Sequence, residues 1–184
     1  MFYVFLANGF EEIEALAPVD FLKRMGVEVV TVGVSGKFIC GAHGINVEAD
    51  ILLSDVQLND DLQGVMLPGG MPGADNLDKC ADVHRAIDFC IDNNKTVAAI
   101  CAAPFILGKK GILKGKNATC FPGFEGELTG ACVSEAGVVT DGNIITARGA
   151  GVAWEFGAAI GTALVNKEKS DGILKAIQWK KQLI

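Results

Sequence analysis

The hydrophobic and polar positions of the chain alternate between short apolar runs and segments of helical periodicity. This alternation is typical of an α/β fold with buried parallel strands. Apolar runs predict strands at residues 2–7, 27–34, 64–68 and 96–100, with shorter ones near 117–120, 131–134, 137–140 and 143–147. Apolar stripes, one of them formed by Ile13, Leu16, Ala17 and Phe21, predict helices at residues 10–25, 81–93, 102–110, 152–166 and 170–182. Segments 37–41 and 45–48 predict a small hairpin.

These elements predict a doubly wound, mostly parallel sheet with helices on both faces, a flavodoxin-like α/β architecture. The 184 residues suit one domain, and no repeat or break in composition divides them, so we expect a single domain over residues 1–184. Sheets of this type bind ligands beyond the carboxyl ends of their strands. Candidate chemistry is therefore sought where strands turn into helices.

Composition and charge exclude several functional classes. With 16 Lys and Arg against 22 Asp and Glu, the net charge of −6 predicts no binding to nucleic acid. No apolar stretch reaches the ~18 residues of a membrane-spanning helix, and no basic segment precedes the apolar start, so we expect no membrane partner and a cytoplasmic location. Six cysteines occur without a C-x-x-C pair and with only two histidines, which predicts reduced thiols and no metal site.

The segment Val97-Ala-Ala-Ile-Cys-Ala-Ala-Pro104 places a cysteine between a predicted strand and a predicted helix. Small residues surround Cys101, as in a nucleophile elbow, and Pro104 suits the first turn of a helix. A helix N-terminus favours the thiolate form of a cysteine. Cys101 is thus either a reactive nucleophile or a buried residue that ends a core strand. The other five cysteines are interpreted as packing residues: Cys40, Cys80, Cys90, Cys120 and Cys132.

Two further corners point to the same end of the sheet. The segment Leu67-Pro-Gly-Gly-Met-Pro-Gly73 follows a predicted strand, and its glycines either bring backbone N–H groups close to a bound oxygen or simply form a turn. In Asn8-Gly-Phe-Glu-Glu-Ile-Glu14, we expect Glu11 and Glu12 to be solvated at a helix N-terminus. Glu14 lies in helical register with buried positions, where desolvation would raise the pKa of its carboxyl group. The alternative is an ordinary carboxylate at the rim of the site.

Ordered motifs along nearly the whole chain resemble the DJ-1/ThiJ/PfpI family of class I glutamine amidotransferase-like proteins, in its short branch. The motifs are Leu6-Ala-Asn-Gly-Phe-Glu-Glu-Ile-Glu-Ala15, Pro18-Val-Asp20, Leu67-Pro-Gly-Gly70, Gly73-Ala-Asp-Asn-Leu77, Ala98-Ala-Ile-Cys-Ala-Ala-Pro104, Thr146-Ala-Arg-Gly-Ala-Gly151 and Glu155-Phe156. The resemblance implies that Cys101 is the reactive, oxidation-prone cysteine and that Glu14 is the acid hydrogen-bonded to its sulfur.

The resemblance also implies an oxyanion pocket formed by backbone N–H groups at Gly69, Gly70 and Ala102. It implies a loop carrying Arg148 near the site, and a homodimer with the site close to the subunit boundary. In the hairpin, His43 is hypothesised to reach toward Cys101 of the partner; the alternative is an ordinary turn histidine.

One departure from the family pattern bears on the reaction. Family members often carry a His-Pro pair after the nucleophile helix, where this chain has Phe121-Pro122. Without a histidine base, nucleophilic hydrolysis is disfavoured, and a peptidase is the weakest interpretation. A thiolate and a carboxylic acid suffice for glyoxalase III or deglycase chemistry on methylglyoxal or its adducts, which needs no cofactor. The alternatives are a redox sensor or oxidative-stress protein, a chaperone, and the family's label of thiazole monophosphate biosynthesis.

Overall fold

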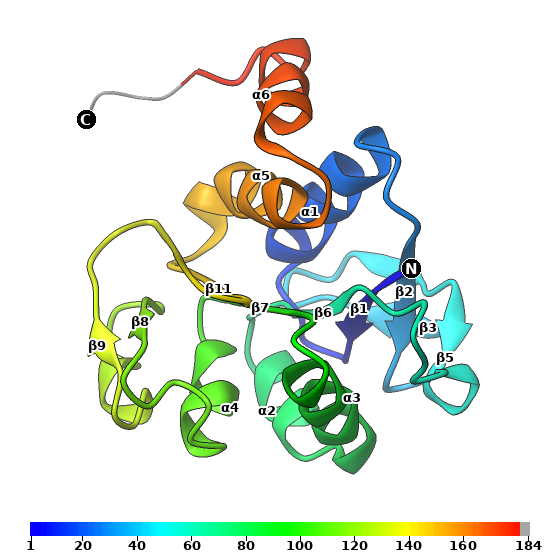
Figure 1. Cartoon of the computed structure of the whole chain (residues 1–184). Coiled ribbons are helices and arrows are strands. Elements are labelled where there is room, and N and C mark those ends of the chain that lie inside the picture. Colours follow the sequence, from blue (N-terminus) through cyan, green and yellow to red (C-terminus); the bar gives the residue numbers. More distant parts are fainter. Residues whose placement is uncertain (181–184) are drawn as a thin grey trace.

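The computed structural model describes residues 1–180 and is built around a seven-stranded sheet (Figure 1). The strand order is β10-β11-β7-β6-β1-β2-β5, and neighbouring strands run parallel except for β10 and β11. These strands are β1 (Phe2–Leu6), β2 (Val29–Gly33), β5 (Ile51–Leu52), β6 (Gly64–Leu67), β7 (Thr96–Ile100), β10 (Val138–Asp141) and β11 (Ile144–Ala147). The predicted doubly wound, mostly parallel sheet is confirmed.

Helices cover both faces of the sheet (Figure 1). On one face lie α1 (Glu12–Arg24) and α5 (Ala153–Leu164), with α6 (Lys167–Ala176) packed outside them. On the other face lie α2 (Gly73–Asp78), α3 (Ala81–Asp92) and α4 (Pro104–Lys109). Within residues 1–180, no helix has the length and apolar character needed to cross a membrane.

Two hydrophobic cores, one on each face, explain the continuous apolar strand segments. Successive side chains of a strand point to opposite faces, so β1 supplies Phe2, Val4 and Leu6 to the core beneath α1 and α5. Tyr3 and Phe5 of the same strand join the opposite core against α3 and α4. Every residue of β1 is buried, as a central parallel strand covered on both sides requires.

The remaining strands form two small ribbons. The predicted hairpin is confirmed as β3 (Phe38–Cys40) paired antiparallel with β4 (Asn46–Glu48). The strands β8 (Asn117–Ala118) and β9 (Cys132–Val133) pair in parallel and are shorter than predicted. Three short 3-10 turns complete the described chain at Leu53–Asp55, Glu125–Glu127 and Ala150–Val152.

The sequence prediction missed two elements and misplaced one helix. The two-residue strand β5 and the six-residue helix α2 are too short to show a periodicity. The last helix begins earlier than the predicted residue 170, because the Asn166 side chain accepts the Lys169 N–H at 2.8 Å and caps it. It ends at Ala176, and the predicted helical positions 181 and 182 lie outside the described residues.

Candidate active site around Cys101

The site lies at the point in the sheet where the chain connections lead off in opposite directions from β1. From β1 the chain continues to β2 on one side, whereas β6 pairs with β1 on the other side. Loops leaving the carboxyl ends of β1, β6 and β7 bring Glu14, Gly69 and Cys101 together. This switch point is where open α/β sheets form ligand sites, as predicted for these corners.

Cys101 adopts the backbone conformation of a nucleophile elbow. Its φ of 65° lies in the left-handed region, which residues with a side chain rarely occupy. The strained turn is held because the Cys101 N–H donates to the Ala147 carbonyl and the Phe121 N–H donates to the Cys101 carbonyl, each at 2.8 Å. Pro104 begins α4, as expected. The side chain is partly exposed, which excludes the alternative of a fully buried strand end.

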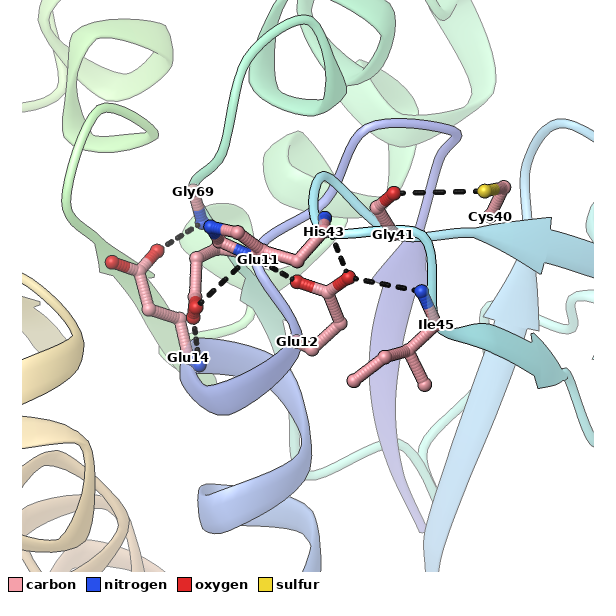
Figure 2. A network of polar contacts seen from close by, with 8 residues as sticks. All are labelled: Glu11, Glu12, Glu14, Cys40, Gly41, His43, Ile45 and Gly69. Carbon is pink, nitrogen blue, oxygen red and sulfur yellow. Dashed lines mark hydrogen bonds and ion pairs between the residues drawn. The ribbon is translucent and has the colours of Figure 1, made fainter.

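Glu14 is buried, with 2% of its surface exposed, so the alternative of a rim carboxylate is wrong. Its backbone N–H donates to Glu11 Oε2 at 2.6 Å, an N-cap that fixes the start of α1. Its carboxylate Oε2 accepts the Gly69 N–H at 3.0 Å (Figure 2). The Cys101 side chain and the Ala150 N–H both act to lower the pKa of this carboxyl group. Burial raises the pKa of Glu14 to about 7.

The glycines beside this pair are required by close packing. A Cβ at Gly69 would lie 2.5 Å from Glu14 Oε2 and 2.6 Å from the Cys101 Cβ. At Gly70, φ is +83° and a Cβ would lie 2.4 Å from the Glu11 nitrogen. The backbone N–H groups of Gly70 and Ala102 are placed so that they lower the pKa of the Cys101 thiol. The Gly69 N–H, which was predicted for the same pocket, donates to Glu14 Oε2 instead, and an oxyanion role for Gly70 and Ala102 stays a prediction.

The pKa of the Cys101 thiol differs from the sequence expectation. Burial raises it to about 12, the Glu14 carboxylate adds to this effect, and the Ala102 and Gly70 N–H groups oppose it. With the pKa of Glu14 raised to about 7 and that of the thiol raised further, the Glu14 carboxyl group is the first of the two neighbours to lose its proton. Between these values the pair holds one proton, and its transfer from sulfur to carboxylate gives a thiolate beside a carboxylic acid.

A second polar network lies next to the site and involves Glu12 (Figure 2). Glu12 was expected to be solvated, but only 2% of it is exposed, because the hairpin β3–β4 covers it. Its Oε1 accepts the His43 backbone N–H at 2.8 Å, and its Oε2 lies 2.7 Å from His43 Nδ1. Ile13, predicted to be on the buried stripe, is 53% exposed instead. His43 therefore engages Glu12 within its own chain, and its hypothesised reach into a partner site stays a prediction.

The network contains the one group of three potential metal-ligating side chains found among residues 1–180. Glu11, Glu12 and His43 each place a ligand atom within 4.8 Å of the others. Both Glu12 oxygens already accept N–H hydrogen bonds, and Glu11 Oε2 accepts the Glu14 N–H. These internal hydrogen bonds account for the cluster, and we propose no metal for it.

Phe121 and Arg148 lie on the other side of Cys101. Both line a cavity of about 430 Å³ together with Pro122 and residues 149–152. A Cβ at Gly149 would lie 3.4 Å from the Phe121 ring and 3.8 Å from Glu14 Oε1. The cavity therefore adjoins the Cys101–Glu14 pair. Both side chains are among the candidates predicted from the sequence, whereas the cavity is visible only in the structure.

The six cysteines are free and differ in exposure. Cys90 and Cys120 are buried and Cys80 is partly buried, in keeping with packing roles. Cys132 is exposed, so its packing interpretation is wrong, whereas Cys40 is exposed on the hairpin and a contact with a partner subunit stays a prediction for it.

Comparisons with known proteins extend these observations. A model of the family described as the DJ-1/PfpI family matches residues 2–163. The protein called DJ-1 homolog B of Arabidopsis thaliana is 37% identical over 169 residues, which are 90% of this chain and 38% of that protein. The chain therefore spans less than half the length of this relative.

Two shorter relatives have names that state an activity. A glutathione-independent glyoxalase of Caenorhabditis elegans is 31% identical, with 91% of this chain and 89% of that protein covered. A deglycase of Pyrococcus abyssi is 33% identical, with coverage of 77% and 86%. Among solved structures, oxidized DJ-1 of Toxoplasma gondii is similar with a TM-score of 0.92, 32% identity and 97% coverage of both chains.

Proposed function

Because the chain belongs to the DJ-1/PfpI family, we propose that it converts small reactive carbonyl compounds through Cys101 and Glu14. The observation that carries the proposal is the buried Glu14 carboxyl group beside Cys101, where a Cβ at Gly69 would meet both residues within 2.6 Å, with the pKa of Glu14 raised to about 7. A carboxyl group with a pKa near neutrality can both give and take a proton at physiological pH. The names of the glyoxalase and deglycase relatives support the same class of reaction.

The proposed reaction turns methylglyoxal and water into lactate. The Cys101 thiolate attacks the aldehyde carbon, and the carboxylic acid of Glu14 gives its proton to the aldehyde oxygen, which produces a hemithioacetal. The N–H groups of Gly70 and Ala102 stabilise the negative charge that develops on that oxygen. As the sulfur forms its bond to carbon, it loses charge, so these donors become free to shift to the oxygen.

Glu14 then moves the hydrogen along the substrate. Its carboxylate removes the proton from the thiol-bearing carbon, which leaves an enediolate, and returns it to the neighbouring carbon. Transfer of the remaining hydroxyl proton to the second oxygen gives a lactoyl thioester on Cys101. Water hydrolyses this thioester to lactate and restores the thiol, and no electrons are exchanged with any other compound. The same attack on the adducts of methylglyoxal with proteins would constitute deglycation.

Methylglyoxal turnover tests the proposal directly. Lactate formation is measured for the wild type, Cys101→Ser and Cys132→Ser, in which an exposed cysteine away from the site is replaced. We expect Cys132→Ser to match the wild type and Cys101→Ser to lose at least about a hundredfold in kcat/KM. Equal rates in all three proteins would exclude catalysis by Cys101.

Oxidation sensing is the second candidate function, and the hydrogen-bond donors at a partly exposed Cys101 favour it. Glu14, Gly70 and Ala102 would hydrogen-bond the oxygens of a sulfenic or sulfinic acid and stabilise it. Mass spectrometry after mild peroxide treatment tests this candidate, with exposed Cys40 and Cys132 as internal controls. Oxidation of Cys101 before these two is expected, and oxidation of all three at one rate would remove the case for a sensor.

A homodimer and a cytoplasmic location are part of the same proposal. Large apolar side chains are exposed near the site at Ile13 (53%) and Ile45 (54%), which lie on either side of Glu12. Pairing of this surface with a second copy would cover them. Light scattering after size-exclusion chromatography, with Ile13→Lys as the disrupting variant, distinguishes a dimer from a monomer.

A further inference from the structure

We propose that the cavity beside Cys101 binds the aromatic substituent of a 2-oxoaldehyde substrate and that Phe121 determines this specificity. The inference rests on the proposed function and goes beyond it by naming the substrate class. The geometry, the lining chemistry and the size of the cavity each contribute to it.

The position of the cavity links it to the reacting atoms. Phe121 is joined to the nucleophile because its backbone N–H donates to the Cys101 carbonyl at 2.8 Å. The loop that carries Gly149 is also joined to the nucleophile, because the Ala147 carbonyl accepts the Cys101 N–H at 2.8 Å. A Cβ at Gly149 would lie 3.4 Å from the Phe121 ring and 3.8 Å from Glu14 Oε1. A substrate with its aldehyde carbon at Cys101 would therefore direct its second substituent toward the Phe121 ring.

The lining of the cavity suits a flat apolar group. The Phe121 side chain is 47% exposed beside Pro122 and Val152, and the glycines at 149 and 151 present backbone without side chains. An exposed phenyl ring next to a reactive cysteine offers a stacking partner, and aromatic pairs gain ~0.5–1.5 kcal/mol beyond their area burial. Arg148 supplies the cationic group among the lining residues and would attract the carboxylate of a 2-hydroxy acid product.

The size of the cavity separates candidate substrates. Its volume of about 430 Å³ falls in the range of sites that bury a small organic ligand. The methyl group of methylglyoxal leaves most of this space to water. A phenyl group in the same place would contact Phe121, Pro122 and Val152 at once. Phenylglyoxal, which the same reaction converts to mandelate, is therefore the matched probe.

Initial rates with phenylglyoxal and methylglyoxal test the specificity. They are measured early, before either aldehyde modifies arginine side chains. We expect kcat/KM for phenylglyoxal to exceed that for methylglyoxal by about tenfold, the lower end of what apolar pockets gain per added carbon group. Phe121→Ala is expected to abolish this ratio. Leu52→Ala, which truncates an exposed apolar residue at the far edge of the sheet, should leave both rates unchanged. A wild-type ratio at or below one, or an equal loss for both aldehydes in Phe121→Ala, would overturn the proposal.

Two further measurements keep the result interpretable. The backbone conformation at residue 149 is one that alanine can adopt, and Gly149→Ala would place a methyl group between Phe121 and Glu14. This variant should therefore reduce phenylglyoxal turnover more than methylglyoxal turnover. Binding of mandelate and lactate, followed by NMR, needs no catalysis: mandelate should bind more tightly, and Phe121→Ala should weaken mandelate alone. Equal binding of the two acids would overturn the inference. If mandelate binds selectively but Cys101 supports no turnover, the proposed function is wrong and the aromatic subsite remains.

Discussion

The carboxyl group of Glu14, on the first turn of α1, lies beside Cys101 at the end of β7, since a Cβ at Gly69 would lie 2.5 Å from Glu14 Oε2 and 2.6 Å from the Cys101 Cβ. Two different loops bring them together: the loop after β6 supplies the Gly69 N–H to the carboxylate, and the segment after β11 supplies the Ala150 N–H. Because backbone groups fix Glu14 and Cys101 in place, the proton between them has two defined positions, on the carboxylate or on the sulfur. The first two predictions follow from this arrangement.

Replacement of Glu14 by glutamine should change the pH dependence of Cys101 alkylation. In the wild type, loss of the first proton from the pair near pH 7 creates the state that can hold a thiolate beside a carboxylic acid. The alkylation rate should therefore rise up to about pH 7 and then level off. In Glu14→Gln the buried thiol titrates alone, and the rate should keep rising above pH 8. Iodoacetamide kinetics from pH 5 to 10 measure this, and exposed Glu168→Gln is the control. A plateau near pH 7 in both variants would mean that Glu14 is not the partner of the thiol.

Glu14→Gln should also stabilise the fold at alkaline pH. The pKa of Glu14 rises from its ordinary value of 4.5 to about 7 on folding, so the native state keeps a proton that the unfolded chain releases. Its contribution to stability is present below pH 4.5 and is lost as the pH rises through 7. At ~1.4 kcal/mol per pKa unit, the loss amounts to roughly 3 kcal/mol, which glutamine avoids. Urea unfolding at pH 4.5, 6 and 8 should show a growing advantage of Glu14→Gln. An advantage independent of pH would contradict a raised pKa.

The sequence was sufficient for the architecture and for the central pair of residues. Apolar runs with helical segments between them require a covered parallel sheet, and Cys101 stands out because small residues surround it at a strand-to-helix corner. The helical register of Glu14 with Phe21 and Met25 predicted burial as one of two alternatives, and all three residues are buried.

Contacts between segments distant in sequence could not be predicted in the same way. Glu12 is buried and Ile13 is exposed because the hairpin β3–β4 covers the first turn of α1, where Gly41 leaves no room for a side chain beside the Glu12 carboxylate. The Ala150 N–H donor and the cavity near Phe121 depend on the loop after β11. The raised pKa of the Cys101 thiol results from burial by the whole fold, whereas the local sequence showed only the helix N-terminus.

Gly69→Ala should disable the site through steric contact. The added Cβ would lie 2.5 Å from Glu14 Oε2 and 2.6 Å from the Cys101 Cβ, so the carboxyl group and the thiol must move apart. We expect a loss of about a hundredfold or more in Cys101-dependent turnover and ~1–3 kcal/mol of destabilisation from overpacking. Gly172→Ala is the matched control, because nothing lies within 4 Å of its Cβ and the change adds a helix-forming residue to α6. Turnover and unfolding free energy measured for both variants decide the matter, and a fully active Gly69→Ala would show that the pair tolerates separation.

The ion pair between His43 and Glu12 should make the attachment of the hairpin depend on pH. The hydrogen bond that His43 donates to Glu12, together with the negative charge of Glu12, raises the pKa of His43 above 6.5. Burial alone would raise the pKa of Glu12, but hydrogen bonds from the His43 side chain and backbone lower it overall. The histidine contribution to stability is thus complete below pH 6.5 and is lost as the pH rises through the folded pKa, whereas that of Glu12 is lost on acidification through its own lowered pKa.

Two measurements check this pair. Replacement of His43 by alanine should destabilise the protein more at pH 6 than at pH 9, as seen by thermal unfolding. In Glu12→Gln the pKa of His43, followed by NMR, should fall because the buried negative charge 2.7 Å from Nδ1 is gone. The remaining carboxylate facing the imidazole is Glu11, whose Oε1 lies 3.8 Å from Nδ1, so part of the upward shift should persist. Glu48→Gln, an exposed change on the same hairpin, should leave the His43 titration as it is in the wild type. If Glu12→Gln and Glu48→Gln titrate alike, the charge of Glu12 does not control His43, and the hairpin is held by the His43 backbone N–H alone.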